Sequence, residues 1–110
     1  MVLNGYCVIM TTTDSEAGAE TIAQALLEKR LAACVQIHPI KSRYLWQGAV
    51  ERAQEWALSI KARAADFEEI ATTIGAAHTY ELPEIVAVPI LAGEADYLDW
   101  IDQATERGKA

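Results

Sequence analysis

The stretch EWALSIKAR, residues 55–63, alternates strictly between apolar and polar side chains. The apolar positions are Trp56, Leu58, Ile60 and Ala62. Because side chains on a strand point alternately to its two faces, this spacing predicts a strand with one dry face. A sheet that contains such a strand packs one face on a core, so the neighbouring segments decide the fold class.

The segments before this stretch predict a buried strand followed by a helix. Residues 6–12 are apolar and β-branched, which is typical of a strand buried on both faces. Apolar side chains then recur at helical spacing from Ala19 to Leu26. Thr13 and Glu16 have the spacing of a capping box, so we expect the helix to begin at Thr13.

Strand character returns in two pieces before residue 55. Residues 32–40 form the first piece, which we expect to bend at Pro39, and residues 44–46 form the second. Gln47 and Gly48 follow, and their composition and position predict a tight hairpin turn. The hairpin therefore leads directly into the alternating strand.

The segments after residue 63 predict a helix, a strand and a final helix. Helical spacing recurs from Phe67 to Ile74, with Gly75 as the expected stop. Residues 85–90 are a short apolar strand, which Pro89 restricts to a strand end or a sheet edge. Residues 97–104 again have the apolar spacing of an amphipathic helix.

The order βαββαβ, with an added C-terminal helix, predicts an α+β ferredoxin-like fold. Its antiparallel sheet would carry both main helices on one face and leave the other face uncovered. Three large aromatic side chains lie in the middle strands and predict an oligomer interface: Tyr44, Trp46 and Trp56. We expect one domain over residues 1–110, with a polar tail over residues 106–110.

The composition excludes several classes of partner. Sixteen acidic and nine basic residues give a net charge of −7, which disfavours nucleic acid and anionic membranes. No apolar run reaches the roughly 20 residues that a membrane helix needs. The first residues lack the pattern of a secretory signal, so we expect a cytoplasmic protein with reduced thiols at Cys7 and Cys34.

The densest polar group is His78, Tyr80, Glu81 and Glu84. An imidazole nitrogen suits copper, zinc or nickel, and a thiolate from Cys34 suits Cu(I). The glutamates can bind a cation through oxygen or orient the imidazole. In a loop before a buried strand, the same side chains can also simply hydrogen-bond the backbone.

A basic pair lies on the polar side of the alternating strand. Lys61 and Arg63 can hold an anionic small molecule, and Lys61 is the candidate for that role. The alternative is a salt bridge to Glu55 or Glu68. The spacing of these residues does not decide between the two.

Five blocks of the sequence resemble the CutA family of divalent-cation tolerance proteins: residues 28–35, 44–48, 61–63, 78–85 and 97–101. The resemblance implies a ferredoxin-like subunit in a compact homotrimer, with long hairpins that reach neighbouring subunits. It also implies an architecture similar to the PII signalling proteins, with ligand sites in clefts between subunits. Copper binding and tolerance to divalent metals are the roles assigned to this family.

The resemblance places Cys34 and the His78 loop at one intersubunit cleft, with Cys34 and His78 as the candidate metal ligands. Three positions depart from the family pattern. Thr79 replaces a proline of the loop motif, and Ala77 stands where some members have a second histidine. Met10 stands where some members have a cysteine implicated in copper binding, and a thioether is a poorer ligand than a thiolate.

Three functions follow from these residues. The first is a homotrimer that binds copper or another divalent cation between subunits. The second is a PII-like sensor or scaffold that binds an anionic metabolite through Lys61. The third is an enzyme with Cys34 as nucleophile and His78 as base, but the sequence has no oxyanion loop, phosphate cradle or cofactor fingerprint. We therefore predict a binding protein and no catalytic residues.

Overall fold

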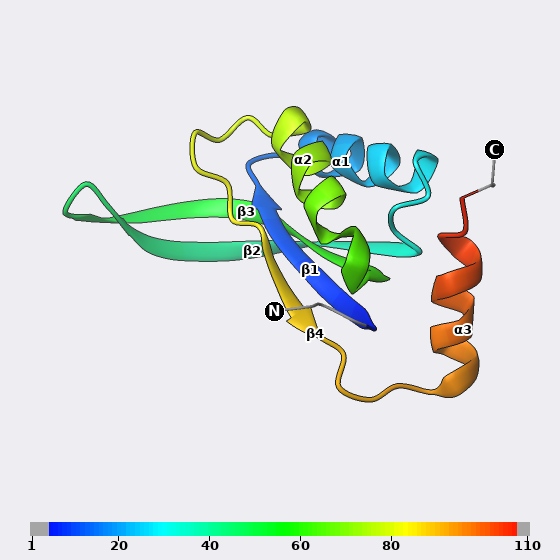
Figure 1. Cartoon of the computed structure of the whole chain (residues 1–110). Coiled ribbons are helices and arrows are strands. Elements are labelled where there is room, and N and C mark those ends of the chain that lie inside the picture. The colour runs from blue at the N-terminus through cyan, green and yellow to red at the C-terminus, as the bar shows by residue number, and fades with distance from the viewer. Residues whose placement is uncertain (1–4, 108–110) are drawn as a thin grey trace.

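Four strands form one antiparallel sheet in the computed structural model, which describes residues 5–107. The strands are β1 (Tyr6–Thr13), β2 (Cys34–Trp46), β3 (Ala49–Arg63) and β4 (Val86–Pro89). They lie in the order β2-β3-β1-β4, which is the order of the expected ferredoxin-like fold. The helices are α1 (Glu16–Glu28), α2 (Phe67–Ala77) and α3 (Ala95–Ala104), and α1 and α2 lie on the same face of the sheet (Figure 1).

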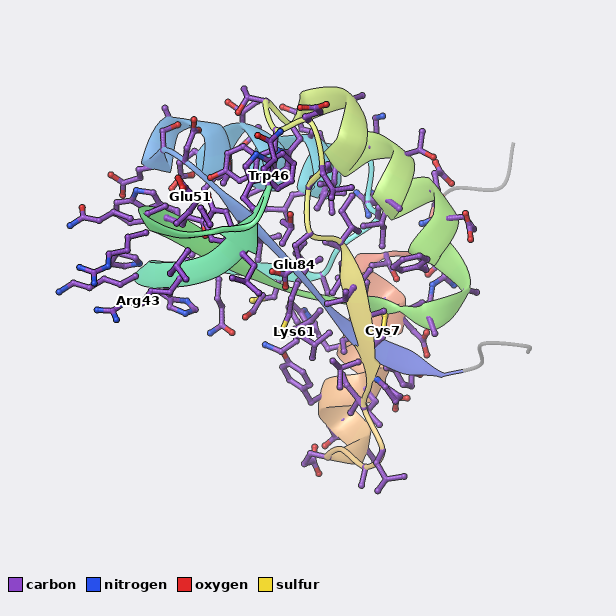
Figure 2. All side chains as sticks on the ribbon, turned by 90° about the vertical axis from the view of Figure 1, so that its left-hand side faces the viewer. Cys7, Arg43, Trp46, Glu51, Lys61 and Glu84 are labelled. Atoms are coloured by element: carbon purple, nitrogen blue, oxygen red, sulfur yellow. The ribbon has the colours of Figure 1, made fainter. Side chains whose placement is uncertain are left out.

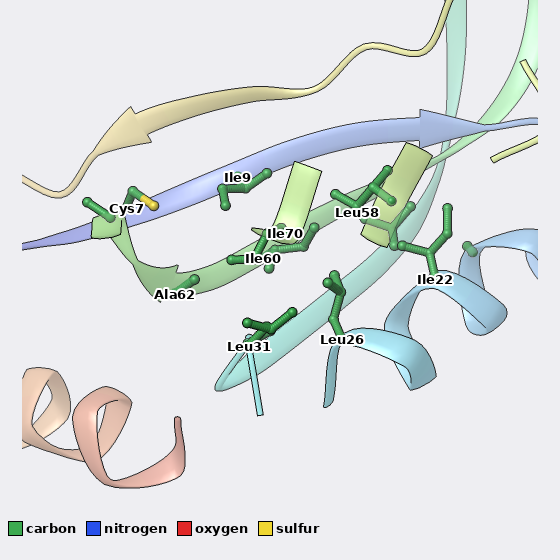
Figure 3. Packing of buried hydrophobic residues seen from close by; sticks show 13 residues of the cluster. Cys7, Ile9, Ile22, Leu26, Leu31, Leu58, Ile60, Ala62 and Ile70 are labelled. Atoms are coloured by element: carbon green, nitrogen blue, oxygen red, sulfur yellow. The ribbon is translucent and has the colours of Figure 1, made fainter. Parts of the chain in front are cut away.

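The core lies between this face and the two helices. Ile9 of β1 is opposite Ile60 of β3, and Thr11 is opposite Leu58. These four side chains are fully buried, and Ile22 of α1 belongs to the cluster of buried hydrophobic side chains shown in Figure 3. The alternation of residues 55–63 thus predicted the correct buried face. Burial of each large aliphatic side chain contributes about 1.5–3 kcal/mol to folding.

The opposite face of the sheet is less well covered. Val86 and Val88 of β4 are exposed, and they lie opposite Met10 and Val8 of β1. The edge position and the end of β4 accommodate Pro89, as predicted, because a proline cannot donate to a neighbouring strand.

The β2–β3 hairpin extends beyond the helices, so the chain is 46 Å long and only 27 Å wide (Figure 1). Gln47 (φ 51°) and Gly48 (φ 82°) form the tight turn at its tip. Two positive φ angles are typical of the type I′ turn that suits a twisted hairpin. Pro39 does not interrupt β2, because β2 is an edge strand with one unpaired side.

Both main helices differ from the sequence prediction at one end. The cap of α1 is Ser15, whose Oγ accepts a hydrogen bond from the Gly18 amide at 3.0 Å, while Thr13 remains in β1. The cap therefore lies two residues later than the capping-box spacing indicated. Gly75 does not end α2, which continues to Ala77.

Helix α3 is held at its C-terminal end. The Tyr6 hydroxyl donates a hydrogen bond to Asp102 at 2.5 Å, and Thr105 is fully buried. The Arg107 guanidinium bonds Asp66 at 2.8 Å and the Arg30 carbonyl at 2.9 Å. Of the predicted tail, residues 108–110 lie outside the described residues. Within residues 5–107, no helix has the length and hydrophobicity to cross a bilayer.

Candidate functional site

The loop between α2 and β4 begins at His78, whose ring is held on both sides. Its Nε2 lies 2.6 Å from the Thr12 carbonyl oxygen, at the end of β1. Its Nδ1 accepts a hydrogen bond from the Tyr80 amide at 3.1 Å. Since a carbonyl oxygen only accepts, Nε2 carries the proton and Nδ1 carries the lone pair. A metal ion would reach His78 only after one of these hydrogen bonds breaks.

These contacts position Tyr80 over β3. The Tyr80 hydroxyl donates a hydrogen bond to Oε2 of Glu55 at 2.7 Å. Burial raises the pKa of Tyr80 well above its usual value, and the hydrogen bond to the Glu55 carboxylate raises it further. Tyr80 therefore stays a neutral hydrogen-bond donor throughout the physiological range.

Glu55 is the most deeply buried carboxylate of the loop region, with 7% of its surface exposed. The Tyr80 hydroxyl is its one hydrogen-bond partner among residues 5–107, and no Lys or Arg of that range forms an ion pair with it. Buried carboxylates are normally paired with a cation, because desolvation of an isolated charge is unfavourable. Glu55 thus combines deep burial with a single hydrogen-bond partner among the described residues.

A groove of about 660 Å³ lies between the loop and the hairpin. The loop contributes Thr79, Tyr80, Glu81, Leu82 and Glu84, and β1 contributes Thr12. The hairpin contributes Ser42, Arg43, Tyr44, Leu45, Trp46, Glu51 and Glu55. Figure 2 looks toward the tip of the hairpin and labels Glu51, Trp46 and Glu84 along this region.

The lining of the groove is acidic. It contains the carboxylates of Glu51, Glu55, Glu81 and Glu84, and Arg43 is its one basic side chain within the described range. Such a surface attracts cations and repels anions. However, no three His, Cys, Asp or Glu side chains of residues 5–107 lie close enough to hold a metal ion together. The described part of the chain thus offers an acidic groove without a group of three metal-ligand side chains.

The structure separates Cys34 from the His78 loop within the chain. Cys34 begins β2 opposite Lys61, which lies opposite Val8 of β1, whereas His78 contacts Thr12. The two levels differ by four residues along the strands, or about 13 Å at 3.3 Å per residue. Cys34 is half-buried and does not line the groove.

Lys61 also lies away from the groove. Its Nζ donates a hydrogen bond to Oε1 of Gln36 at 2.9 Å. Arg63 pairs with Asp66, at 3.3 Å. The alternative of a salt bridge from this basic pair to Glu55 or Glu68 is therefore not found among residues 5–107. Gln36 is a diagonal neighbour of Lys61 on β2, since Cys34 lies directly opposite Lys61, and Asp66 lies in the turn that follows Arg63.

The structure thus brings three of the six predicted site residues into the groove: Tyr80, Glu81 and Glu84. His78 orients the loop behind them, while Cys34 and Lys61 lie elsewhere on the sheet. Sequence reasoning missed Glu51 and Glu55 as site residues. A signal was present for Glu55, which begins the alternating stretch at the position where its polar side chain faces away from the core.

The fold and the site are those of an α+β protein with a ferredoxin-like sheet and an acidic groove. Residues 7–104 match the family described as CutA1 divalent ion tolerance protein. The chain is 47% identical over 98 residues to the divalent-cation tolerance protein CutA of Archaeoglobus fulgidus, covering 89% of this chain and 96% of that protein. The corresponding protein of Thermus thermophilus is 46% identical over 99 residues, with the same two coverages.

Solved structures of proteins in this family have the same fold as this chain. The structure titled periplasmic divalent cation tolerance protein CutA from Archaeoglobus fulgidus superposes with a TM-score of 0.90, covering 92% of this chain and 99% of that one. The structure of the Thermus thermophilus protein gives a TM-score of 0.89 at 45% identity, again covering 92% and 99%. The chain belongs to the CutA1 family of divalent ion tolerance proteins.

Proposed function

We propose that this protein is a cytoplasmic homotrimer that binds copper or another divalent cation in acidic grooves between subunits, and that this binding supports metal tolerance. The observation that carries the proposal is the lining of the groove, where four carboxylates face a single guanidinium among the described residues. The family to which the chain belongs supports the role in divalent-cation tolerance.

A cation fits this groove better than the anionic metabolite of a PII-like sensor. An anion would have to approach Glu51, Glu55, Glu81 and Glu84 with Arg43 as its attractive partner in the groove. Lys61, which was predicted to hold such an anion, does not line this groove and donates a hydrogen bond to Gln36. The electrostatic potential of the groove therefore favours positively charged ligands.

A second subunit is needed to complete the ligand set. The loop carboxylates Glu81 and Glu84 supply oxygen ligands, but the subunit brings no third ligand residue close to them within residues 5–107. Cys34 lies at the start of the edge strand β2, where a neighbouring subunit can place it against another copy's loop. Carboxylate ligands alone favour harder cations, and a thiolate from Cys34 shifts the preference toward copper and zinc.

Titration calorimetry with Zn²⁺ and Cu²⁺ tests this proposal on the purified protein. We expect stoichiometric binding by the wild type and a loss of at least about tenfold in affinity for Glu81→Gln with Glu84→Gln, because the neutral amides remove charge from the groove. Glu16→Gln with Glu20→Gln, on the exposed face of α1, is the matched control and should bind as wild type does.

Cys34→Ser separates the roles of thiolate and carboxylate. This variant should lose affinity for copper more than for Mn²⁺, because Mn²⁺ prefers oxygen ligands. Unchanged zinc and copper affinity in both the Glu81/Glu84 and the Cys34 variants would contradict the proposed site. Sedimentation of the wild type as single subunits at micromolar concentration would contradict the trimer.

A further inference from the structure

One face of the β2–β3 hairpin forms the floor of the acidic groove. Tyr44 lies opposite Glu51 in the register of the hairpin, and Trp46, two residues further along β2, shares the face of Tyr44. Figure 2 labels Glu51 and Trp46 at this end of the hairpin. Glu55 is four residues from Glu51 on β3, so it belongs to the same face, and all four residues line the groove. The floor thus combines two aromatic rings with two carboxylates.

The two carboxylates of the floor stand at separate points along the groove. Glu51 and Glu55 have Cα atoms about 13 Å apart, at 3.3 Å per residue of strand. The hydrogen bond from Tyr80 holds the Glu55 carboxylate at its own end. A metal ion needs ligand atoms that converge on one point, and no group of three His, Cys, Asp or Glu side chains does so among residues 5–107. A ligand that pairs with both carboxylates therefore needs two separated positive charges.

Glu55 is a buried carboxylate with unused capacity for a donor. It is 7% exposed, and it lines the groove. Its Oε2 accepts the hydrogen bond from Tyr80, whereas its Oε1 accepts none among residues 5–107, and no ion pair of that range includes it. Hydrogen bonds from a charged donor to a carboxylate are about twice as strong as those between neutral groups. An ammonium group that enters the groove would therefore gain both a hydrogen bond and a charge partner at Glu55.

Aromatic and apolar side chains supply the rest of the lining on which an organic cation depends. Tyr44 and Trp46 are 45% and 40% exposed, so their rings remain accessible, and the loop adds Tyr80 and Leu82. The face of an aromatic ring attracts ammonium groups, and alkyl chains gain from burial on the same surface. A volume of about 660 Å³ is in the range of pockets that hold small organic molecules. The groove thus offers an alkyl chain more than it offers a bare metal ion.

We propose that the groove binds a linear aliphatic polyamine. One ammonium group pairs with Glu55 and another pairs with Glu51, while the alkyl chain between them lies on the aromatic rings of the floor. The methylene segments of such a molecule separate its charges, as the length of strand between the two carboxylates separates theirs. This inference goes beyond the proposed metal function and does not rest on it, because the proposed metal ligands of the groove lie on the loop side.

Titration calorimetry with spermine, a linear tetra-amine, tests this assignment on the purified protein. We expect the wild type to bind spermine and Glu51→Gln with Glu55→Gln to bind it about tenfold more weakly or worse, because the amides keep the shape of the side chains and remove their charge. Glu20→Gln with Glu28→Gln makes the same change in charge in a second acidic hollow, on α1, which has no aromatic lining. This control should bind spermine as the wild type does.

Two single substitutions test the floor and its one basic neighbour. Trp46→Leu should weaken spermine binding about two- to fivefold, because leucine keeps apolar contact but has no aromatic face. Arg43 also lines the groove and repels cations, so Arg43→Gln should tighten binding by about twofold or more. Arg52→Gln is the matched control for charge, because Arg52 lies opposite Arg43 but does not line the groove, and it should tighten binding less.

A shorter probe tests whether the ligand spans both carboxylates. Butylamine carries a single ammonium group and can pair with Glu51 or Glu55 but not with both. It should therefore bind at least about 100-fold more weakly than spermine, since linked charges make the second contact intramolecular. Equal affinity of the wild type for butylamine and spermine would overturn the inference.

The remaining outcomes separate this inference from the proposed function. Equal spermine affinity in the wild type and in Glu51→Gln/Glu55→Gln would overturn the polyamine site, and so would a wild type that does not bind spermine, whether or not zinc binds. Binding of spermine without binding of zinc would support the site and overturn the metal function. If circular dichroism shows that the double variant is unfolded, Glu51→Gln alone replaces it, with an expected loss of about threefold.

Discussion

Strand β3 passes through two environments that share one hydrogen-bonding register. From Glu55 to Arg63 it lies under the helices, and Leu58, Ile60 and Ala62 are buried there. Residues 49–54 have the same partner strand but no helix above them, and all except the half-buried Ala53 are exposed. Backbone pairing alone thus does not distinguish a stable segment from a marginal one. The two halves differ in how far other side chains cover them, so the inner half stabilises the fold while the outer half stays exposed.

The largest difference between the halves should appear on truncation of equivalent aliphatic side chains. Ile60→Ala removes fully buried methyl groups, and we expect it to cost about 2–5 kcal/mol in the free energy of unfolding. Val50→Ala should cost less than about 0.5 kcal/mol at high dilution. Urea unfolding measures both. An equal cost at high dilution would contradict the contrast, whereas a cost for Val50→Ala that grows with protein concentration would sharpen it.

The boundary between the halves is marked by the Tyr80–Glu55 hydrogen bond. Tyr80→Phe leaves a buried carboxylate without its donor, so we expect a loss of about 1.5–3 kcal/mol at neutral pH. The raised pKa of Tyr80 also predicts a pH effect. The folded state favours the neutral phenol, so stability is full below the unfolded pKa of 10.0 and falls as the pH rises above it.

Thermal unfolding from pH 8 to about pH 11 measures this effect, because an unperturbed tyrosine titrates near pH 10. The Tyr80→Phe variant should lose less stability over this range than the wild type. Its remaining loss reflects Tyr6, whose pKa is raised mainly by its hydrogen bond to Asp102. Tyr97→Phe, which alters an exposed ring on α3, is the control. Parallel curves for wild type and Tyr80→Phe would argue against a stabilising role of this phenol.

The smallest expected effect lies inside the core half. The Thr11 hydroxyl is buried without a hydrogen-bond partner within residues 5–107. Thr11→Val replaces it with a methyl group of similar shape, so we expect a gain of about 1 kcal/mol in the free energy of unfolding. Thr105→Val is the matched control, because the buried Thr105 hydroxyl bonds the Ile101 carbonyl at 2.7 Å and its loss should destabilise. Destabilisation by Thr11→Val would show that the hydroxyl has a partner in solution.

The fold could be predicted from the sequence wherever burial gives the apolar residues a regular spacing. The alternation of residues 55–63 identified the core face, and the helical spacing from Ala19 to Leu26 identified α1. Helix ends were less predictable because competing caps lay close together. Thr13 and Ser15 are both cap-forming residues. Thr13 pairs with Trp56 of β3 and therefore stays in β1, so Ser15 caps the helix. Gly75 needed no positive φ, so nothing required α2 to stop there.

The site could be predicted only in part. Tyr80, Glu81 and Glu84 are close in sequence and reached one groove, because a short loop carries them together. Glu55 joins them across 25 residues through a single hydrogen bond, and no local spacing indicates such a pairing. His78 had the right identity for a metal ligand, yet backbone groups occupy both ring nitrogens, a contact that depends on how β1 and α2 pack.

The anchoring of Arg107 bears on how the protein should be handled. Its guanidinium joins the segment after α3 to the turn after α1 and to Asp66 at the start of α2. A truncation that removes Arg107 would leave Asp66 with Arg63 as its remaining partner and free the last turn of α3 to fray. An affinity tag is therefore better joined through a flexible spacer beyond residue 110 than spliced directly onto the end of that helix.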